Sequence, residues 1–153
     1  FKRDNAGIDN EIDFLATVPI FESLSNRQKV KLFSIMYTRK YENGEVVFRQ
    51  GDPGVGLYVL KKGVVDVFSE YQDNTCCKIT SLSPGEFFGE TSLLNESPRS
   101  ATVIASSEST LLGLFKPELL SLMDSDPKLG LRLIYRLAQV VAERLRLIND
   151  QLG

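Results

Sequence analysis

Residues 87–103, FFGETSLLNESPRSATV, carry the most informative pattern in the sequence. Gly89 permits a close backbone approach or an unusual φ, and residues 91–94 can form one short helical turn. Amides at the start of such a turn point outward without partners, which favours an anion there. Residues 95–98 suit a turn, and we expect Arg99 to begin the next strand beside that anion site.

The same segment carries side chains that suit a sugar phosphate. The guanidinium of Arg99 can donate two parallel hydrogen bonds to a phosphate, Ser100 adds a hydroxyl donor, and Glu90 offers a carboxylate acceptor. A ligand with sugar hydroxyls near a single phosphate would satisfy these groups. The alternative is a surface loop with an incidental Glu90–Arg99 ion pair, because exposed ion pairs are common and contribute little.

Short β-strands are predicted on both sides of this segment, over residues 37–115. Asn-Gly, Gly-Asp-Pro-Gly, Lys-Gly and Ser-Pro-Gly turns separate them. The strands are expected at 46–48, 57–60, 64–68, 79–82, 101–105 and 111–115. Many short strands at this spacing predict a closed or doubled antiparallel sheet, such as a jelly roll of about eight strands.

Helices are predicted before the β region. Residues 9–36 are expected to form two of them. Asp9 or Asn10 could cap the first, and Ser25 opens the second. Together with the helices after the strands, this predicts an α+β fold in which helices flank an antiparallel β-roll.

Helices also follow the β region. Lys116-Pro117-Glu118 suits a helix start, because Pro is tolerated in the first turn and Glu favours the positive helix end. A break is expected at 124–127, and a long helix then runs over about 128–152.

The long helix carries more apolar surface than one buried face requires. A heptad seam runs through Ile134, Ala138, Val141, Leu145, Ile148 and Leu152, and a neighbouring stripe through Leu133, Leu137, Val140 and Leu147. One stripe can pack on the β region and the other on a partner helix, so we expect a homodimer through this helix. The alternative is a single wide buried face.

The composition excludes several classes of function. The 153 residues suit one domain, and they include no histidine. Neither a Ser-His-Asp triad nor a histidine metal site can therefore be built, and we expect no enzyme, no metal and no cofactor. The net charge of −2 argues against a broad basic face for nucleic acid. Four arginines of the long helix, Arg132, Arg136, Arg144 and Arg146, have acidic neighbours and indicate a solvated face.

Cysteine use and hydropathy indicate a cytoplasmic protein. Cys76 and Cys77 are adjacent, and neighbouring residues rarely form a disulfide with each other, so we expect two reduced thiols. No apolar run is long enough for a membrane span, and no signal-peptide pattern opens the chain. The first residue is Phe1, so we expect a piece of a longer protein.

Residues 87–103 resemble the phosphate-binding cassette of the cyclic nucleotide-binding domain family. The family pattern is Phe-Gly-Glu, a small residue, a Leu pair, a variable loop, then Pro-Arg, a small residue, Ala and Thr. The matching residues are Phe88, Gly89, Glu90, Ser92, Leu93, Leu94, Pro98, Arg99, Ser100, Ala101 and Thr102. Residues 44–68 resemble the family's glycine-punctuated early strands, and the likeness covers residues 10–150. It implies a single cyclic nucleotide-binding domain over 1–153, with helices at 9–36, a β-roll at 37–115 and helices at 116–152.

The resemblance implies a role for each cassette residue. Glu90 would accept a hydrogen bond from the ribose 2′-hydroxyl, and Arg99 would pair with the exocyclic phosphate oxygens. Gly89, the backbone amides of Glu90 and Ser92, and the Ser100 amide or hydroxyl would complete the phosphate site. Because Ser also follows the arginine in cAMP-binding members, whereas Thr is frequent in those that prefer cGMP, the ligand is expected to be cAMP, with cGMP possible.

Further roles are implied outside the phosphate site. Asp66 matches an acidic position that bonds the cassette arginine in kinase regulatory subunits, and Leu93 matches a hydrophobic position that moves when the cassette tightens. A residue of the last helix covers the purine in this family. Arg144, Ile148 and Asn149 are the candidates for that base contact, and the alternative is that they are exposed or packing residues.

The resemblance implies a sensor that binds a cyclic nucleotide in the roll and repositions its C-terminal helices to control an effector outside this chain. Two alternatives stay open. One is a degenerate β-roll that serves only as a dimerisation or interaction module, although intact Glu90 and Arg99 argue against it. The other is the sensor half of a DNA-binding transcription regulator. The domain alone is expected to bind neither nucleic acid nor a membrane.

Overall fold

The computed structural model describes residues 5–70 and 76–152, with side chains over residues 10–70 and 77–150. The chain divides into two compact units. A helical unit is formed by the residues up to Ser34 and from Leu119 onward, and a β unit is formed by residues 35–118.

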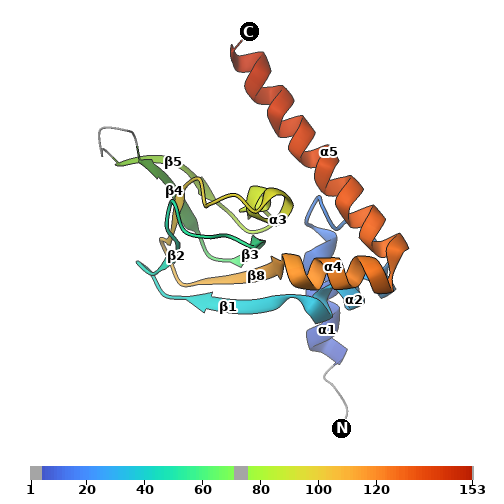
Figure 1. The fold of residues 1–153 in the computed structure, drawn as a ribbon. Helices are drawn as coiled ribbons and strands as arrows, with labels where there is room; N and C mark the ends of the chain where they lie inside the picture. Colours follow the sequence, from blue (N-terminus) through green and yellow to red (C-terminus); the bar gives the residue numbers. More distant parts are fainter. Residues whose placement is uncertain (1–4, 71–75, 153) are drawn as a thin grey trace. The chain divides into compact units, whose positions relative to one another are not determined.

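The β unit consists of two antiparallel sheets of four strands each (Figure 1). The first has the order β1-β8-β3-β6, with β1 (Tyr37–Tyr41), β8 (Ser109–Phe115), β3 (Gly56–Lys62) and β6 (Phe87–Phe88). The second has the order β2-β7-β4-β5, with β2 (Val46–Phe48), β7 (Thr102–Ala105), β4 (Val65–Glu70) and β5 (Cys76–Leu82). The predicted antiparallel β-roll in an α+β fold is therefore confirmed.

Side chains from both sheets form the core of the β unit. Its buried members are Tyr58, Leu60, Val65, Phe88, Val103 and Leu111. Successive strand residues point to opposite faces, so alternate positions of β3 and β4 meet in this core. Two strands had no individual prediction: β1, whose residues are mostly exposed and polar, and β6, which has only two residues.

The helical unit confirms most of the predicted helices and corrects one boundary. α1 spans Asn5–Ala16, so the expected cap at Asp9 or Asn10 is wrong, because both residues lie inside the helix. α2 spans Asn26–Ile35. Its cap at Ser25 is confirmed, because the Gln28 amide donates to Ser25 Oγ at 3.2 Å and the Ser25 amide donates to Gln28 Oε1 at 2.9 Å. This reciprocal pair is a capping box.

The C-terminal helices also follow the expected boundaries. α4 spans Lys116–Ser125 and α5 spans Pro127–Leu152. The break between them is stabilised by Asp126, which accepts hydrogen bonds from Lys31 Nζ at 3.1 Å and from the Leu129 amide at 3.3 Å. These bonds, led by the one from Lys31, hold the pKa of the Asp126 carboxyl below its usual value.

The apolar residues of α5 differ in their exposure to solvent. Leu129, Leu133 and Leu137 are buried, whereas Leu145 and Ile148 are 58% and 53% exposed. The buried Leu133 and Leu137 belong to the neighbouring stripe, whereas Leu145 and Ile148 belong to the heptad seam. The homodimer through this seam stays a prediction. Within residues 5–70 and 76–152, we find no helix with the length and apolar character needed to cross a membrane. Cys77 carries a free thiol, and the side chain of Cys76 lies outside the described residues.

Candidate functional site

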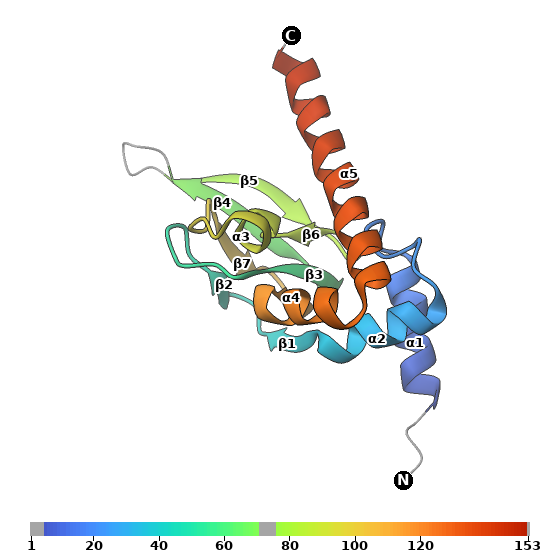
Figure 2. The same cartoon turned by 45° about the vertical axis from the view of Figure 1, so that its right-hand side comes forward.

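The segment after β6 forms the short helix that the sequence predicted. α3 spans Glu90–Asn95 and packs beside β3 (Figure 2). Gly89 precedes it with φ 83°, a left-handed conformation that suits glycine. A Cβ at Gly89 would also lie 2.5 Å from Arg99 Nη1, so the position requires glycine for two reasons.

Arg99 is the buried cation of this segment. Only 6% of its surface is exposed. Its Nη1 donates to the Gly56 carbonyl at 2.8 Å and to the Gly89 carbonyl at 3.3 Å. Its Cζ lies 4.1 Å from the centroid of the Phe48 ring and 5.9 Å from that of Tyr58, which favours a cation.

The hydrogen-bonding capacity of the Arg99 guanidinium is only partly used. Its Nε is buried without a hydrogen-bond partner in the described part of the chain, and burial lowers the pKa of the guanidinium. A buried cation is costly unless an anion accompanies it. The arrangement therefore favours an anionic ligand beside Arg99.

The backbone of Arg99 corrects one expectation from the sequence. Arg99 does not begin the next strand, because β7 starts at Thr102. Its amide donates to the Asp52 carbonyl, and its carbonyl accepts from the Gly51 amide, both at 2.8 Å. The arginine backbone is therefore tied to the loop between β2 and β3 and not to a sheet ladder.

The predicted cassette residues line one small cavity of about 140 Å³. Gly89, Glu90, Ser92, Arg99 and Ser100 all contribute to it. The buried Ser92 hydroxyl donates to the Ser97 carbonyl at 3.0 Å, which leaves the Ser92 amide as its group for a ligand.

Several lining residues were missed by the sequence reasoning. They are Phe48, Val67, Phe88, Thr91, Ala101 and Val103. Phe48 and Val67 belong to distant strands, so no local motif marks them. Phe88 and Ala101 were part of the cassette pattern, and their place beside the cavity could have been inferred from it.

Gly54 is a further residue of the site that the sequence reasoning did not assign. A Cβ at this position would lie 2.6 Å from Arg99 Nε and 2.7 Å from Ser92 Cβ. Both distances are shorter than real contacts allow. The loop after β2 therefore packs directly against the arginine and α3, and only a glycine leaves room for both.

The carboxylate of Asp66 contacts side chains of the neighbouring strand β5. Its Oδ1 accepts from the Ser81 hydroxyl at 2.6 Å and lies 3.4 Å from Lys78 Nζ. The hydrogen bond from Ser81 is the main cause that lowers the pKa of Asp66. The neighbouring Val67 lines the cavity, and strand alternation directs Asp66 to the other face of the sheet.

The remaining implied roles stay predictions. Leu93 is 2% exposed, as expected for a hydrophobic residue under the cassette, but its movement is untested. Arg144, Ile148 and Asn149 lie on α5 in the helical unit. Their contact with the base stays a prediction.

An eight-stranded roll with a buried arginine at a small cavity is an arrangement that suits a small anionic ligand. The sequence profile of the cyclic nucleotide-binding domain family matches residues 38–126, which is more than half of the chain. The chain belongs to this family.

Named relatives and solved structures agree with this membership. The cyclic AMP receptor protein of Thermus thermophilus is 35% identical over 128 residues, which cover 84% of this chain and 57% of that protein. A cAMP-dependent protein kinase regulatory subunit of Hypocrea atroviridis is 38% identical over 96 residues, or 63% of this chain and 20% of that protein. The chain thus spans only part of the length of these relatives.

The structural comparison gives the same fold. The crystal structure of the Thermus thermophilus catabolite activator protein matches with a TM-score of 0.80 and 34% identity, over 88% of this chain and 61% of that one. A cyclic nucleotide-binding domain from Methylobacillus flagellatus matches with a TM-score of 0.83 and 26% identity, over 96% of this chain and 83% of that one.

Proposed function

We propose that this domain is a cAMP sensor that controls an effector outside the chain. The observation that carries the proposal is Arg99, a buried guanidinium at the cavity that donates to the carbonyl oxygens of Gly56 and Gly89. A cyclic phosphate would supply the missing negative charge through charge-assisted hydrogen bonds. Family membership and a relative named as a cyclic AMP receptor protein support the same ligand.

The other groups around the cavity suit the rest of the ligand. Glu90 is half-buried at the start of α3 and lines the cavity with Ser100, so a ribose hydroxyl could donate to its carboxylate while the phosphate meets Arg99. Ser100 follows the arginine, as in cAMP-binding members. In this proposal Gly89, Ser92 and Ser100 complete the phosphate site.

The proposed output is a shift between two arrangements of the C-terminal helices. A ligand shifts such an equilibrium by its difference in affinity for the two states. We propose that Leu93 and Asp66 transmit this change, that residues of α5 cover the base, and that the exposed seam of α5 holds a homodimer. A cytoplasmic location and a non-enzymatic role belong to the same proposal.

Calorimetric titration with cAMP and cGMP tests the proposed ligand. We expect saturable heat with cAMP and a weaker response with cGMP. A domain that gives no heat with either nucleotide, while remaining folded by circular dichroism, would instead be the degenerate interaction module, and the sensor proposal would fail.

The Glu90→Gln variant tests the ribose contact. We expect cAMP binding to weaken by about 1.5–3 kcal/mol, the usual contribution of a hydrogen bond to a charged group. The measurement is calorimetry with cAMP and with 2′-deoxy-cAMP. If Glu90 accepts from the 2′-hydroxyl, the variant should discriminate little between the two ligands, whereas the unsubstituted domain should strongly prefer cAMP.

The matched control is Glu108→Gln, which removes the same charge at an exposed position of the β unit away from the lining residues. It should bind both ligands as the unsubstituted domain does. Full preference for cAMP over 2′-deoxy-cAMP in Glu90→Gln would remove Glu90 from the ribose contact.

A further inference from the structure

The helical unit contains a second pocket that the proposed nucleotide site does not use. It is an open cavity of about 630 Å³ between α5 and the turn after α1. The turn contributes Glu22 and Ser23, and α5 contributes Arg132, Tyr135, Arg136 and Gln139. These α5 positions are spaced 3, 4 and 7 residues from the first, so they share one face of the helix.

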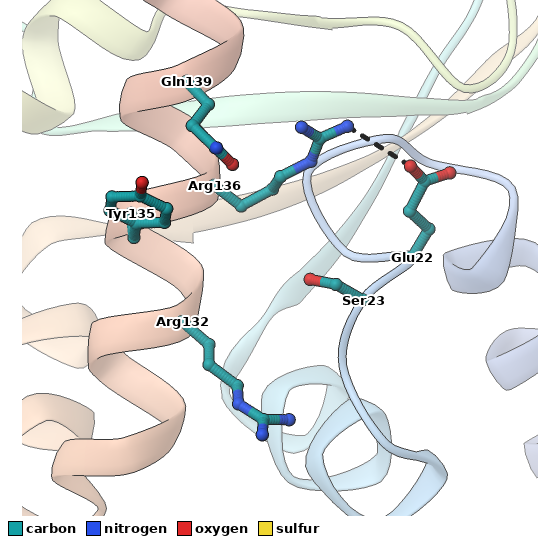
Figure 3. Close-up of a pocket in the computed structure, with 6 residues that line it drawn as sticks. All are labelled: Glu22, Ser23, Arg132, Tyr135, Arg136 and Gln139. Atoms are coloured by element: carbon teal, nitrogen blue, oxygen red, sulfur yellow. Dashed lines mark hydrogen bonds and ion pairs between the residues drawn. The ribbon is translucent and has the colours of Figure 1, made fainter.

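One arginine of this pocket is held in place by the turn. Arg136 donates from Nε to the Pro19 carbonyl at 3.0 Å and from Nη2 to Glu22 Oε1 at 3.2 Å. Figure 3 shows this ion pair at one side of the pocket. The two bonds use two of the five N–H donors of a guanidinium, so a fixed Arg136 retains donors for a third partner.

The second arginine has no carboxylate partner within the described residues. Arg132 donates from Nη1 to the neutral Gln28 Oε1, at a long 3.4 Å. Figure 3 shows both arginines extending from α5, with Arg136 directed at Glu22 of the turn. Arg132 is directed instead toward α2 (Asn26–Ile35), which carries Gln28. The lining therefore holds two positive charges and one negative charge, Glu22, and one positive charge is unmatched.

We propose that this pocket binds an acidic peptide segment of a protein partner, with a carboxylate between Arg132 and Arg136. A guanidinium pairs with a planar carboxylate through parallel hydrogen bonds, and the hydroxyl of Ser23 is a further donor in the same lining. This inference does not depend on nucleotide binding, because all lining residues belong to the helical unit.

Size and exposed apolar surface favour a peptide over a single small ion. A volume of about 630 Å³ far exceeds the roughly 30 Å³ share of one water molecule. Tyr135 is 63% exposed and Leu131, one turn before it, is 68% exposed. Tyr and Arg are enriched at protein interfaces. The exposed side chains of Tyr135 and Leu131 offer contacts to the peptide residue next to the bound carboxylate.

Nuclear magnetic resonance titration tests this proposal on the chain of residues 1–153. The probe is the acetylated and amidated peptide Glu-Glu-Leu-Glu, compared with inorganic phosphate at equal ionic strength. The signals followed are those of the Arg132, Tyr135 and Gln139 side chains, so binding beside Arg99 is not counted. We expect saturable shifts with the peptide and much weaker ones with phosphate.

Three variants test whether each charge strengthens or weakens binding of the peptide. Arg132→Gln should weaken peptide binding about three- to tenfold, the range for a partly exposed hydrogen-bonded charge. Arg146→Gln is the matched control, because it removes the same charge from the same helix, where Arg146 pairs with Glu143 and Asp150. It should change binding less than twofold. Glu22→Gln should tighten binding, since it releases Arg136 for the peptide.

Several outcomes would overturn the proposal. Absence of saturable shifts would show that the pocket takes no acidic peptide. Equal shifts with phosphate would indicate a small-anion site. Equal weakening by Arg132→Gln and Arg146→Gln would indicate unspecific attraction. The opposite signs expected for Glu22→Gln and Arg132→Gln keep the test valid even where one variant is less stable, and urea unfolding checks both.

Discussion

Replacing Arg99 with alanine should weaken cAMP binding by about 2–5 kcal/mol, the range for removing one partner of a buried charge pair. Arg99 is 6% exposed, and its guanidinium donates to two backbone carbonyl oxygens. A phosphate bound there would have Arg99 as its main positive charge in a site with little water, where the interaction is strong. Calorimetric titration with cAMP measures the loss.

Two further variants separate charge from shape. Arg99→Lys keeps the charge but loses the planar fork and its stacking on Phe48, so we expect an intermediate loss. Arg39→Ala is the matched control, because Arg39 also lies over an aromatic ring, that of Phe115 at 5.5 Å, but outside the cavity. It should bind cAMP normally. Unchanged affinity in a folded Arg99→Ala variant would place the phosphate elsewhere.

The conformation of the cassette could be predicted from the sequence, because the residues that determine it are close together in the chain. Gly89 was expected to allow a close backbone approach or an unusual φ, and its φ is 83°. The residues after it form the expected short helix. Most strands also followed, since turn residues mark their ends. The capping box at Ser25 was predictable for the same reason: its two residues are three positions apart.

The site residues outside the cassette are positioned by the pairing of strands that are distant in the sequence. A single local motif does not determine which strands pair. Phe48 meets Arg99 because β2 pairs with β7, although about fifty residues separate them. The direction of the Asp66 side chain depends on its register opposite Ser81. A family pattern can place an acidic residue on a strand, but the structure must show which partner it meets.

The turn Gly51-Asp52-Pro53-Gly54 shows the same limit. Its residues predicted a turn between strands, and this prediction is confirmed, since they lie between β2 and β3. Only tertiary contacts show that the turn also supports the ligand site. The Gly51 amide donates to the Arg99 carbonyl, and the Asp52 carbonyl accepts from the Arg99 amide. Gly54 packs against Arg99 and Ser92.

Substitution of Gly54 by alanine should weaken cAMP binding and lower stability together, each by about 1–3 kcal/mol, as expected for an overpacked site. The new Cβ would lie 2.6 Å from Arg99 Nε, so the guanidinium must move from the position where it meets the ligand. Ser92 must move as well, because its Cβ would be 2.7 Å away. Calorimetry with cAMP and thermal unfolding measure the two effects.

Gly44→Ala is the matched control for this prediction. Gly44 has φ 91°, and a Cβ there would meet nothing within 4 Å, so alanine strains the backbone without touching the cassette. It should lower the melting temperature and leave cAMP affinity unchanged. In a double-mutant cycle, Ser92→Ala should lessen the loss caused by Gly54→Ala, since it removes the hydroxyl that the new Cβ would contact. If Gly54→Ala lowers only stability, as Gly44→Ala should, the loop supports the fold but does not position Arg99.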